Sequence, residues 1–182
     1  MEYEVIRSNR KTLAIQIRGD KLLVRAPLRA TDADITAFLQ KHKGWVDKHL
    51  AKVRAQQSVA AEMKLTMDEI RDLAAKALEV IPARVKHYAP LVGVTYGRIT
   101  IRNQRSKWGS CSSKGNMNFN CLLMLAPPEV LDSVVVHELC HRKEMNHSDR
   151  FYAEVLRVFP NYHKCHKWLK ENGPILMGRM IG

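Results

Sequence analysis

The short run VVVHELCHRKEMNHSDRF, residues 134–151, concentrates side chains that could bind a metal or move a proton. His137 and His141 are four residues apart, so on a helix they lie only about 40° apart, one turn above the other. Two imidazole nitrogens at that spacing can bind one ion, and H-E-x-x-H on a helix is therefore typical of zinc hydrolases. Glu138 would flank the metal, as a base that activates water requires. The apolar run at 131–136 predicts that this helix is buried and that its histidines face a protected cleft.

Four groups compete to be the third ligand. Glu144 lies on nearly the same face as His137, but about 10.5 Å further along the axis of a straight helix. We therefore expect Glu144 to support a ligand or to lie at the mouth of the site. Cys140 points to the other side of the pair and is expected to pack as a small buried group. His163 and His166 also have helical spacing, but their lysine neighbours favour a surface or packing role.

The fourth candidate is His147, which is ten residues after His137 and too distant for one continuous helix. Asn146 tolerates the left-handed conformation that ends helices, and Ser148 or Asp149 can cap a new helix. A reversal of the chain there would bring His147 back to the metal. We therefore predict His147 as the third ligand and expect Ser148 to support the site from beside it.

The elements upstream of this segment begin with a predicted β-hairpin. Residues 4–27 alternate between apolar and polar side chains around the turn-like Gly19-Asp20, with a further strand expected near the start, and Pro27 ends the hairpin. Thr31 is predicted to cap a helix that runs to about residue 57. The segment QQSVAAEMK, residues 56–64, is expected to be a connection.

A capping box, TMDE at 66–69, predicts a second helix that Pro82 kinks and Pro90 ends. Residues 94–125 consist of short runs broken by glycine, asparagine and serine, which indicate an antiparallel meander with a turn at 114–116. The motif APPE opens a third helix. We expect further helices at 149–158 and 162–170, and a C-terminal tail, 173–182, that is either loose or packed on a partner.

The formal net charge of the 182 residues is +12, so the chain should attract nucleic acid, nucleotides or other polyanions. No acidic residue occurs between Glu79 and Glu129, so this stretch is either an anion-facing wall or a basic face without a specific ligand. Its basic residues are Arg84, Lys86, Arg98, Arg102, Arg105, Lys107 and Lys114.

The N-terminal residues carry charges of both signs and no apolar run, so no signal peptide is expected. No stretch approaches the roughly 18 apolar residues of a membrane span. The four cysteines never occur as C-x-x-C and are expected to be reduced thiols. These features predict a cytoplasmic protein that does not insert into a membrane.

Three motifs, at 105–120, 125–141 and 137–151, together resemble the YgjP-like metal-dependent hydrolases. This bacterial and archaeal family is classed with the zincin metallopeptidases and is similar in active-site layout to SprT-type proteases. The likeness extends from RKTLAIQI at 10–17 to HKWLKE at 166–171.

This resemblance implies zinc held by His137, His141 and His147, with Glu138 as general base. The last ligand in the family belongs to an H-S-x-x-F pattern, matched here by His147, Ser148 and Phe151. The metzincin pattern shares the spacing of the second and third histidines, but it needs glycine where this chain has Glu144.

The expected fold class is α+β and zincin-like, in which a small antiparallel sheet packs on helices and an H-E-x-x-H helix forms the active site. The expected parts are an N-terminal β-hairpin region at 1–30, a helical region at 31–92, a catalytic core at 93–172 and a tail at 173–182. We expect these parts to form one compact domain.

Three neutral imidazoles leave zinc one open position, as in catalytic rather than structural sites. Zinc lowers the pKa of water toward roughly 7, and Glu138 would take the proton. The same chemistry serves carbonyl and phosphoryl centres, so three functions compete. The first is a peptidase, in which an edge strand pairs with an extended peptide. The second is a nucleoside triphosphate pyrophosphatase, which the resemblance also admits, especially for uridine triphosphate. The third is a nucleic-acid-binding protein with structural zinc.

The motif RSKWGSC, residues 105–111, contains the candidate substrate-binding residues. Arg105 and Lys107 could hold phosphates, and Trp108 could stack on a base or serve as a core anchor. Ser110 is a further candidate, although Gly109 and Ser110 could simply form a bulge.

Overall fold

The computed structural model describes residues 2–18, 21–104 and 106–180. The chain divides into two compact units, residues 1–59 and 60–182. The boundary falls inside the segment 31–92 that the sequence pattern assigns to one helical region. In the part of the chain described, no helix combines the length and the apolar character needed to cross a bilayer.

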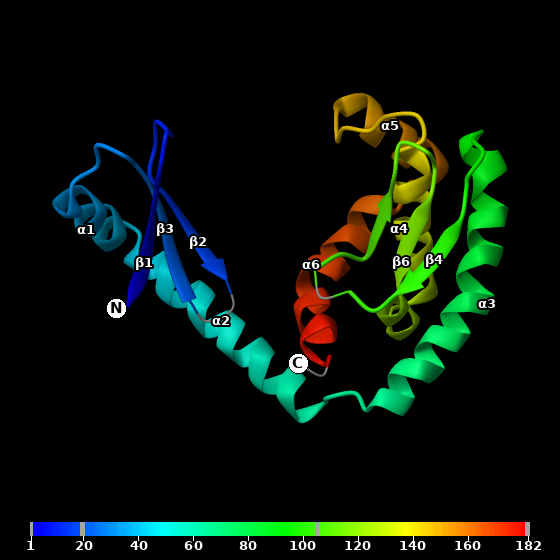
Figure 1. The fold of residues 1–182 in the computed structure, drawn as a ribbon, viewed down its shortest axis with the longest axis horizontal. Helices are drawn as coiled ribbons and strands as arrows, with labels where there is room; N and C mark the ends of the chain where they lie inside the picture. The colour runs from blue at the N-terminus through cyan, green and yellow to red at the C-terminus, as the bar shows by residue number, and fades with distance from the viewer. Residues whose placement is uncertain (1, 19–20, 105, 181–182) are drawn as a thin grey trace. The chain divides into compact units, whose positions relative to one another are not determined.

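The first unit contains a three-stranded sheet made of β1 (Tyr3–Ser8), β2 (Ala14–Arg18) and β3 (Lys21–Pro27) (Figure 1). The strand order is β1-β3-β2, with β2 antiparallel and β1 parallel to the central β3. The predicted hairpin and the additional N-terminal strand are thus confirmed. The turn predicted at Gly19-Asp20 lies outside the described residues.

Two helices follow this sheet, α1 (Asp32–Lys41) and α2 (Lys43–Glu62). Thr31 caps α1 as predicted, and Asp34 completes a capping box with it. The prediction of one helix to residue 57 is wrong, because the helix is interrupted at His42 and α2 continues through the expected connection. Residues 55–62 consist mainly of alanine, glutamine and glutamate, which are strong helix formers. The buried core of this unit is Leu22, Val24, Ala26, Ile35, Leu39 and Val46.

The second unit begins with the long helix α3 (Met67–Val92), which opens with the predicted Thr66 capping box. The helix does not end at Pro90. It continues to Gly93, which adopts the left-handed conformation with φ of 78°. Each proline within α3 leaves a carbonyl four residues earlier without a donor. Those carbonyls belong to Leu78 and Lys86, which are exposed, so water can satisfy them.

The second sheet consists of β4 (Ile99–Arg102), β5 (Gly109–Cys111) and β6 (Met117–Asn120) in the order β4-β6-β5. β5 and β6 form an antiparallel hairpin, but β4 is parallel to β6, so the predicted antiparallel meander is wrong for this pair. β6 takes the centre because its apolar side chains are fully buried. β5 is left at the edge of the described sheet.

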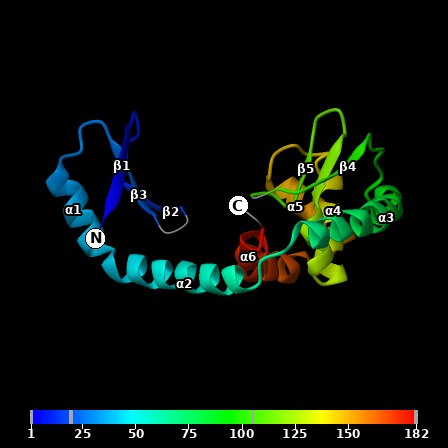
Figure 2. The same cartoon turned by 60° about the horizontal axis from the view of Figure 1, so that its bottom comes forward.

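A 3-10 helix, η1 (Cys121–Leu125), leads from the sheet to α4 (Pro128–Cys140), α5 (Asp149–Val158) and α6 (Tyr162–Gly178). The predicted helix at 149–158 is confirmed, whereas α6 extends beyond residue 170 and takes in much of the expected tail. In this unit the sheet lies beside α3 and α4, with β4 contacting α3 and β5 contacting α4 (Figure 2). All four cysteines are free thiols.

Candidate metal centre and active site

Helix α4 carries His137 and Glu138 at its C-terminal end. The helix is buried on nearly every side, since the residues from Val130 to Val136 and Leu139 are all buried. The burial predicted from the apolar run before the motif is therefore confirmed. His141 occupies the C-cap position, so the second histidine of the motif lies where the chain begins to leave the helix.

The chain reverses after α4 without a left-handed residue. No residue other than glycine has a positive φ in the ranges that the structure describes, so the expectation for Asn146 is wrong. A tight turn ends the helix instead, in which the backbone N–H groups of Lys143 and Glu144 donate to the Cys140 carbonyl. The Ser148 hydroxyl then accepts from the Phe151 amide and caps α5, as predicted.

This reversal brings the imidazoles of His137, His141 and His147 together, with one ligand atom of each lying within 4.8 Å of the others. The Nε2 atoms of His137 and His147 are 3.1 Å apart. The fully buried ring of Phe151 lies against all three imidazoles, stacked on His141 at 4.6 Å and edge-on to the other two. Phe151, the aromatic residue of the H-S-x-x-F pattern, therefore packs against all three histidines and helps to hold their rings in place.

The second ring nitrogen of two of these histidines has a partner of its own. His137 Nδ1 lies 2.8 Å from the Tyr162 hydroxyl oxygen, and His141 Nδ1 lies 3.1 Å from the Glu144 carbonyl oxygen. Such contacts fix the ring and its tautomer, so that the other nitrogen can face an ion. Glu144 thus supports the site through its backbone carbonyl, where the sequence suggested its carboxylate.

The electrostatic environment favours neutral imidazoles. Burial, reinforced by the neighbouring histidines, lowers the pKa of His137 to about 3, and burial also lowers the pKa of His141. Imidazole must be neutral to bind a metal. The donor set and its spacing therefore fit a divalent ion such as zinc.

Glu138 is 5% exposed and lies beside strand β5. Burial raises the pKa of its carboxyl to about 8, against the opposing charge of Lys107. Its Oε2 atom is buried without a hydrogen-bond partner. A side chain at Gly109 would place its Cβ 2.7 Å from both Cγ and Oε1 of Glu138. Glycine at this position therefore makes room for the carboxylate, a role that the sequence did not reveal.

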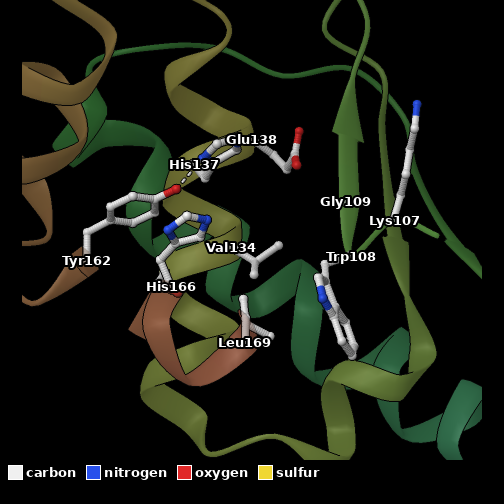
Figure 3. Close-up of a pocket in the computed structure, with 10 residues that line it drawn as sticks. Lys107, Trp108, Gly109, Val134, His137, Glu138, Tyr162, His166 and Leu169 are labelled. Carbon is white, nitrogen blue, oxygen red and sulfur yellow. Dashed lines mark hydrogen bonds between the residues drawn. The ribbon is translucent and has the colours of Figure 1, made fainter. Parts of the chain in front are cut away.

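Two hollows flank Glu138. Both are lined by Lys107, Gly109, His137 and Glu138. The first, of about 210 Å³, continues between Trp108, Ser133, Val134, Tyr162, His166 and Leu169 (Figure 3). The second, of about 280 Å³, continues along Ser110, Cys111, His141, Met145 and His147. Glu138 therefore contributes to the walls of both hollows.

The predicted substrate-binding residues occupy different surroundings. Lys107 is exposed at both hollows. Trp108 is partly buried against Gly173 of α6 and also lines the first hollow, so it is a core anchor with one accessible face. The Ser110 hydroxyl accepts from the Asn118 amide and lines the second hollow. Arg105 lies outside the described residues.

The remaining candidate ligands lie outside the histidine cluster. Cys140 is fully buried, as expected for a packing residue. His163 is exposed, whereas His166 stacks on Tyr162 with ring centroids 5.6 Å apart and lines the first hollow. The packing role considered for His166 is therefore the one observed.

Sequence reasoning missed Tyr162 and Asn120. Tyr162 opens α6 and contacts His137 from 25 residues away, and no local pattern marks such a contact. Asn120 is fully buried, and its Nδ2 donates to the carbonyls of Gln104 at 2.6 Å and Lys107 at 3.0 Å. Asn120 thereby holds the loop that leads into β5. An asparagine within the apolar run 117–125 was the only available signal.

Comparisons with known proteins identify the family of this chain. A family model described as "YgjP-like, metallopeptidase domain" matches residues 11–73 and 66–172. No curated protein matches the chain. Among solved structures, the metallopeptidase zymogen abylysin of Pyrococcus abyssi is similar at 21% identity and a TM-score of 0.46, over 50% of this chain and 94% of that one. The family match spans both units, and this chain belongs to the YgjP-like family of metallopeptidase domains.

Proposed function

We propose that this protein is a zinc-dependent peptidase of zincin-like layout, in which His137, His141 and His147 bind the ion and Glu138 is the general base. One observation carries the proposal: three imidazoles converge beside a buried carboxylate whose Oε2 has no partner. Unpaired buried polar groups are costly, so such an atom is expected where a ligand or water completes the site.

The histidine cluster suits zinc in its donor types and its spacing. The 3.1 Å between two Nε2 atoms is close to the separation expected of two nitrogens that each lie about 2.0–2.1 Å from one ion. Three protein ligands are the number found in catalytic zinc sites. When bound, zinc supplies a Lewis acid and a water of lowered pKa.

Glu138 performs the proton transfers in this proposal. Its carboxylate takes a proton from the attacking water and returns it to the nitrogen of the leaving amine. The Oε2 atom of Glu138 has no partner in the protein, so it is available to take up this proton and hold it between the two steps. Gly109 keeps the space that this carboxylate occupies.

A peptide is the substrate that the surroundings favour. β5 lies at the edge of its sheet and beside Glu138, so its free backbone groups can pair with an extended chain. The two hollows lie on either side of Glu138, as side chains on both sides of a cleaved bond require. The match to a metallopeptidase domain points the same way.

The pyrophosphatase and nucleic-acid alternatives stay predictions, and in their favour Lys107 and Trp108 both line the first hollow. Two cations of the proposed anion-facing wall are already engaged within the protein. Arg84 donates to Asp132, with Nε 2.6 Å from Oδ1, and Arg102 donates to Asn118 at 3.0 Å. The Asp132 carboxylate offsets the charge of Arg84, and the neutral Asn118 amide occupies one donor of Arg102 that a phosphate would use.

The test compares the zinc-loaded protein with three variants, on casein-derived peptides and on a panel of nucleoside triphosphates. Glu138→Gln should keep zinc and lose peptide turnover. His147→Ala should lose both, and His163→Ala, an exposed histidine on α6, should lose neither. Zinc content is measured separately from activity. Full zinc content in His147→Ala would refute the ligand assignment, and triphosphate turnover that depends on Glu138, without peptide cleavage, would refute the peptidase.

A further inference from the structure

The first hollow differs from the second in the chemistry of its walls. Beyond Glu138 it is bounded by Trp108, Val134 and Leu169, which come from the loop before β5, from α4 and from α6. Figure 3 shows Val134 next to Leu169, with the Trp108 indole across from both. These three side chains form an apolar wall, and Ser133, Tyr162 and His166 line the rest of the hollow beyond the carboxylate.

Resting on the proposed peptidase function, we propose that this hollow receives an apolar side chain of the peptide substrate, on the residue that follows the cleaved bond. The proposal names a substrate class and makes Leu169 and Val134 the residues that determine specificity.

The size of the hollow limits its occupant to one side chain. Its volume is about 210 Å³, below the roughly 300–1,000 Å³ typical of sites that enclose a whole small molecule. A base with its ribose and phosphates would extend well beyond it. A leucine or phenylalanine side chain, attached to a backbone that stays outside, is an occupant of suitable size.

The walls also select against charge. Val134 and Leu169 are buried, and the indole of Trp108 packs on Gly173. Burial lowers the pKa of His166, which keeps this imidazole neutral. At the apolar wall formed by Val134, Leu169 and Trp108, a charged group would lose its water without a partner, at a cost of several kcal/mol. Lys107 lies at the exposed rim.

The direction of the peptide follows from the direction of β5. The first hollow adjoins Trp108 and Gly109 at the start of the strand, and the second adjoins Ser110 and Cys111 toward its end. A peptide that pairs antiparallel to β5, the commoner arrangement, places its C-terminal side at the first hollow. The apolar residue therefore follows the bond that Glu138 faces.

The test begins with the zinc-loaded protein and a tryptic digest of casein, in which mass spectrometry identifies each cleavage position. Synthetic peptides then vary only the residue after the bond among leucine, phenylalanine, alanine and aspartate. We expect kcat/KM for leucine to exceed that for alanine or aspartate by about 10–200-fold, the range of apolar pockets.

Two variants with opposite effects test whether Leu169 determines the preference for the residue after the cleaved bond. Leu169→Ala enlarges the hollow and should raise the kcat/KM ratio of phenylalanine to leucine about tenfold, whereas Leu169→Phe narrows it and should favour alanine. Leu73→Ala is the matched control, because Leu73 of α3 is a partly buried leucine that lines neither hollow. Its ratios should equal those of the unaltered protein. The opposing directions keep the test decisive if one variant folds poorly.

The outcomes separate this inference from the proposed function. Peptide cleavage with ratios that neither Leu169 variant changes would refute the specificity hollow and leave the peptidase intact. Apolar residues enriched before the cleaved bond, rather than after it, would also refute the proposal. No peptide cleavage by the zinc-loaded protein would refute both. A further readout is binding of the leucine peptide to Glu138→Gln, which should weaken in Leu169→Phe and persist in Leu73→Ala.

Discussion

Two segments meet at Glu138, and different kinds of contact hold them. The histidine segment, residues 137–151, is organised largely by its own backbone, since the turn that ends α4 and the cap of α5 are both internal to it. The β5 segment, residues 106–111, is held by Asn120 and Gly173, one from the central strand and one from α6. The positions of the three histidines are thus set mostly by contacts within their own segment, whereas the position of β5 depends on residues distant in sequence. Mutations should therefore be able to change turnover without changing metal binding, and the reverse.

Gly109→Ala should produce the largest loss of turnover that leaves metal binding unchanged. The added Cβ would lie 2.7 Å from Oε1 of Glu138, and the β5 backbone is fixed by its pairing with β6, so the carboxylate must move. A general base contributes about 10²–10⁴-fold. We expect kcat to fall at least about 100-fold while zinc content, measured by atomic spectroscopy, stays constant.

The control for this change is Gly44→Ala on α2, where the same Cβ would meet no atom within 4 Å. This variant should retain full turnover. Retention of full turnover by Gly109→Ala would show that the position of the Glu138 carboxylate does not limit the reaction.

The sequence predicted the histidine segment well because its information is local. Helical spacing relates His137 to His141, and the Ser148 cap is readable within a few residues, so the convergence on His147 followed. The backbone conformation of the turn could not be predicted in the same way, because Asn146 can end a helix in more than one conformation. The Cys140 carbonyl accepts the turn's hydrogen bonds instead.

The β5 segment was predicted less well because the residues that surround it are distant in sequence. Alternating runs predicted strands, but no local pattern states that β6 lies between β4 and β5. That order depends on burying Met117 and Phe119 at the centre. It leaves Gly109 against Glu138, so the role of this glycine became visible only in three dimensions.

Tyr162→Phe tests a contact that the histidine segment makes with a residue distant in sequence. The change removes the hydroxyl 2.8 Å from His137 Nδ1 and keeps the ring. Loss of such an outer partner typically costs about 10–100-fold in metal affinity, which competition with a chelator measures. Tyr152→Phe is the control, because it removes a hydroxyl from the ring that stacks on His147. Equal zinc affinity in the two variants would refute the orienting role of Tyr162.

Asn120→Ala should damage the β5 segment and spare the metal. The substitution leaves the partly buried carbonyls of Gln104 and Lys107 without this donor. Each group left unsatisfied costs about 1–3 kcal/mol in free energy of unfolding. We expect lower stability in urea and a several-fold higher KM, with unchanged zinc affinity. Asn172→Ala is the control, because that amide donates to Trp168 within α6. A loss of zinc affinity in Asn120→Ala alone would contradict the separation of the two segments.

The smallest expected effect concerns an ion pair that ties the turn after α4 to α5. Arg157 and Lys143 both donate to Glu154, at 2.6 and 2.5 Å from Oε1, and lower its pKa to about 2. Because the folded pKa lies below the ordinary value of 4.5, the pair stabilises the fold above that pH. The stabilisation is lost as pH falls from about 4.5 toward 2.

Glu154→Gln should therefore lower the free energy of unfolding by about 1 kcal/mol at pH 7, and the difference from the unaltered protein should shrink steadily as pH falls from about 4.5 to 2. Asp47→Asn, in an exposed pair within α2, is the control and should show a smaller difference. Urea unfolding at a series of pH values measures both. A difference for Glu154→Gln that stays undiminished at pH 2 would mean that packing, rather than charge, ties the turn to α5. The histidine segment would then depend on tertiary contacts as the β5 segment does.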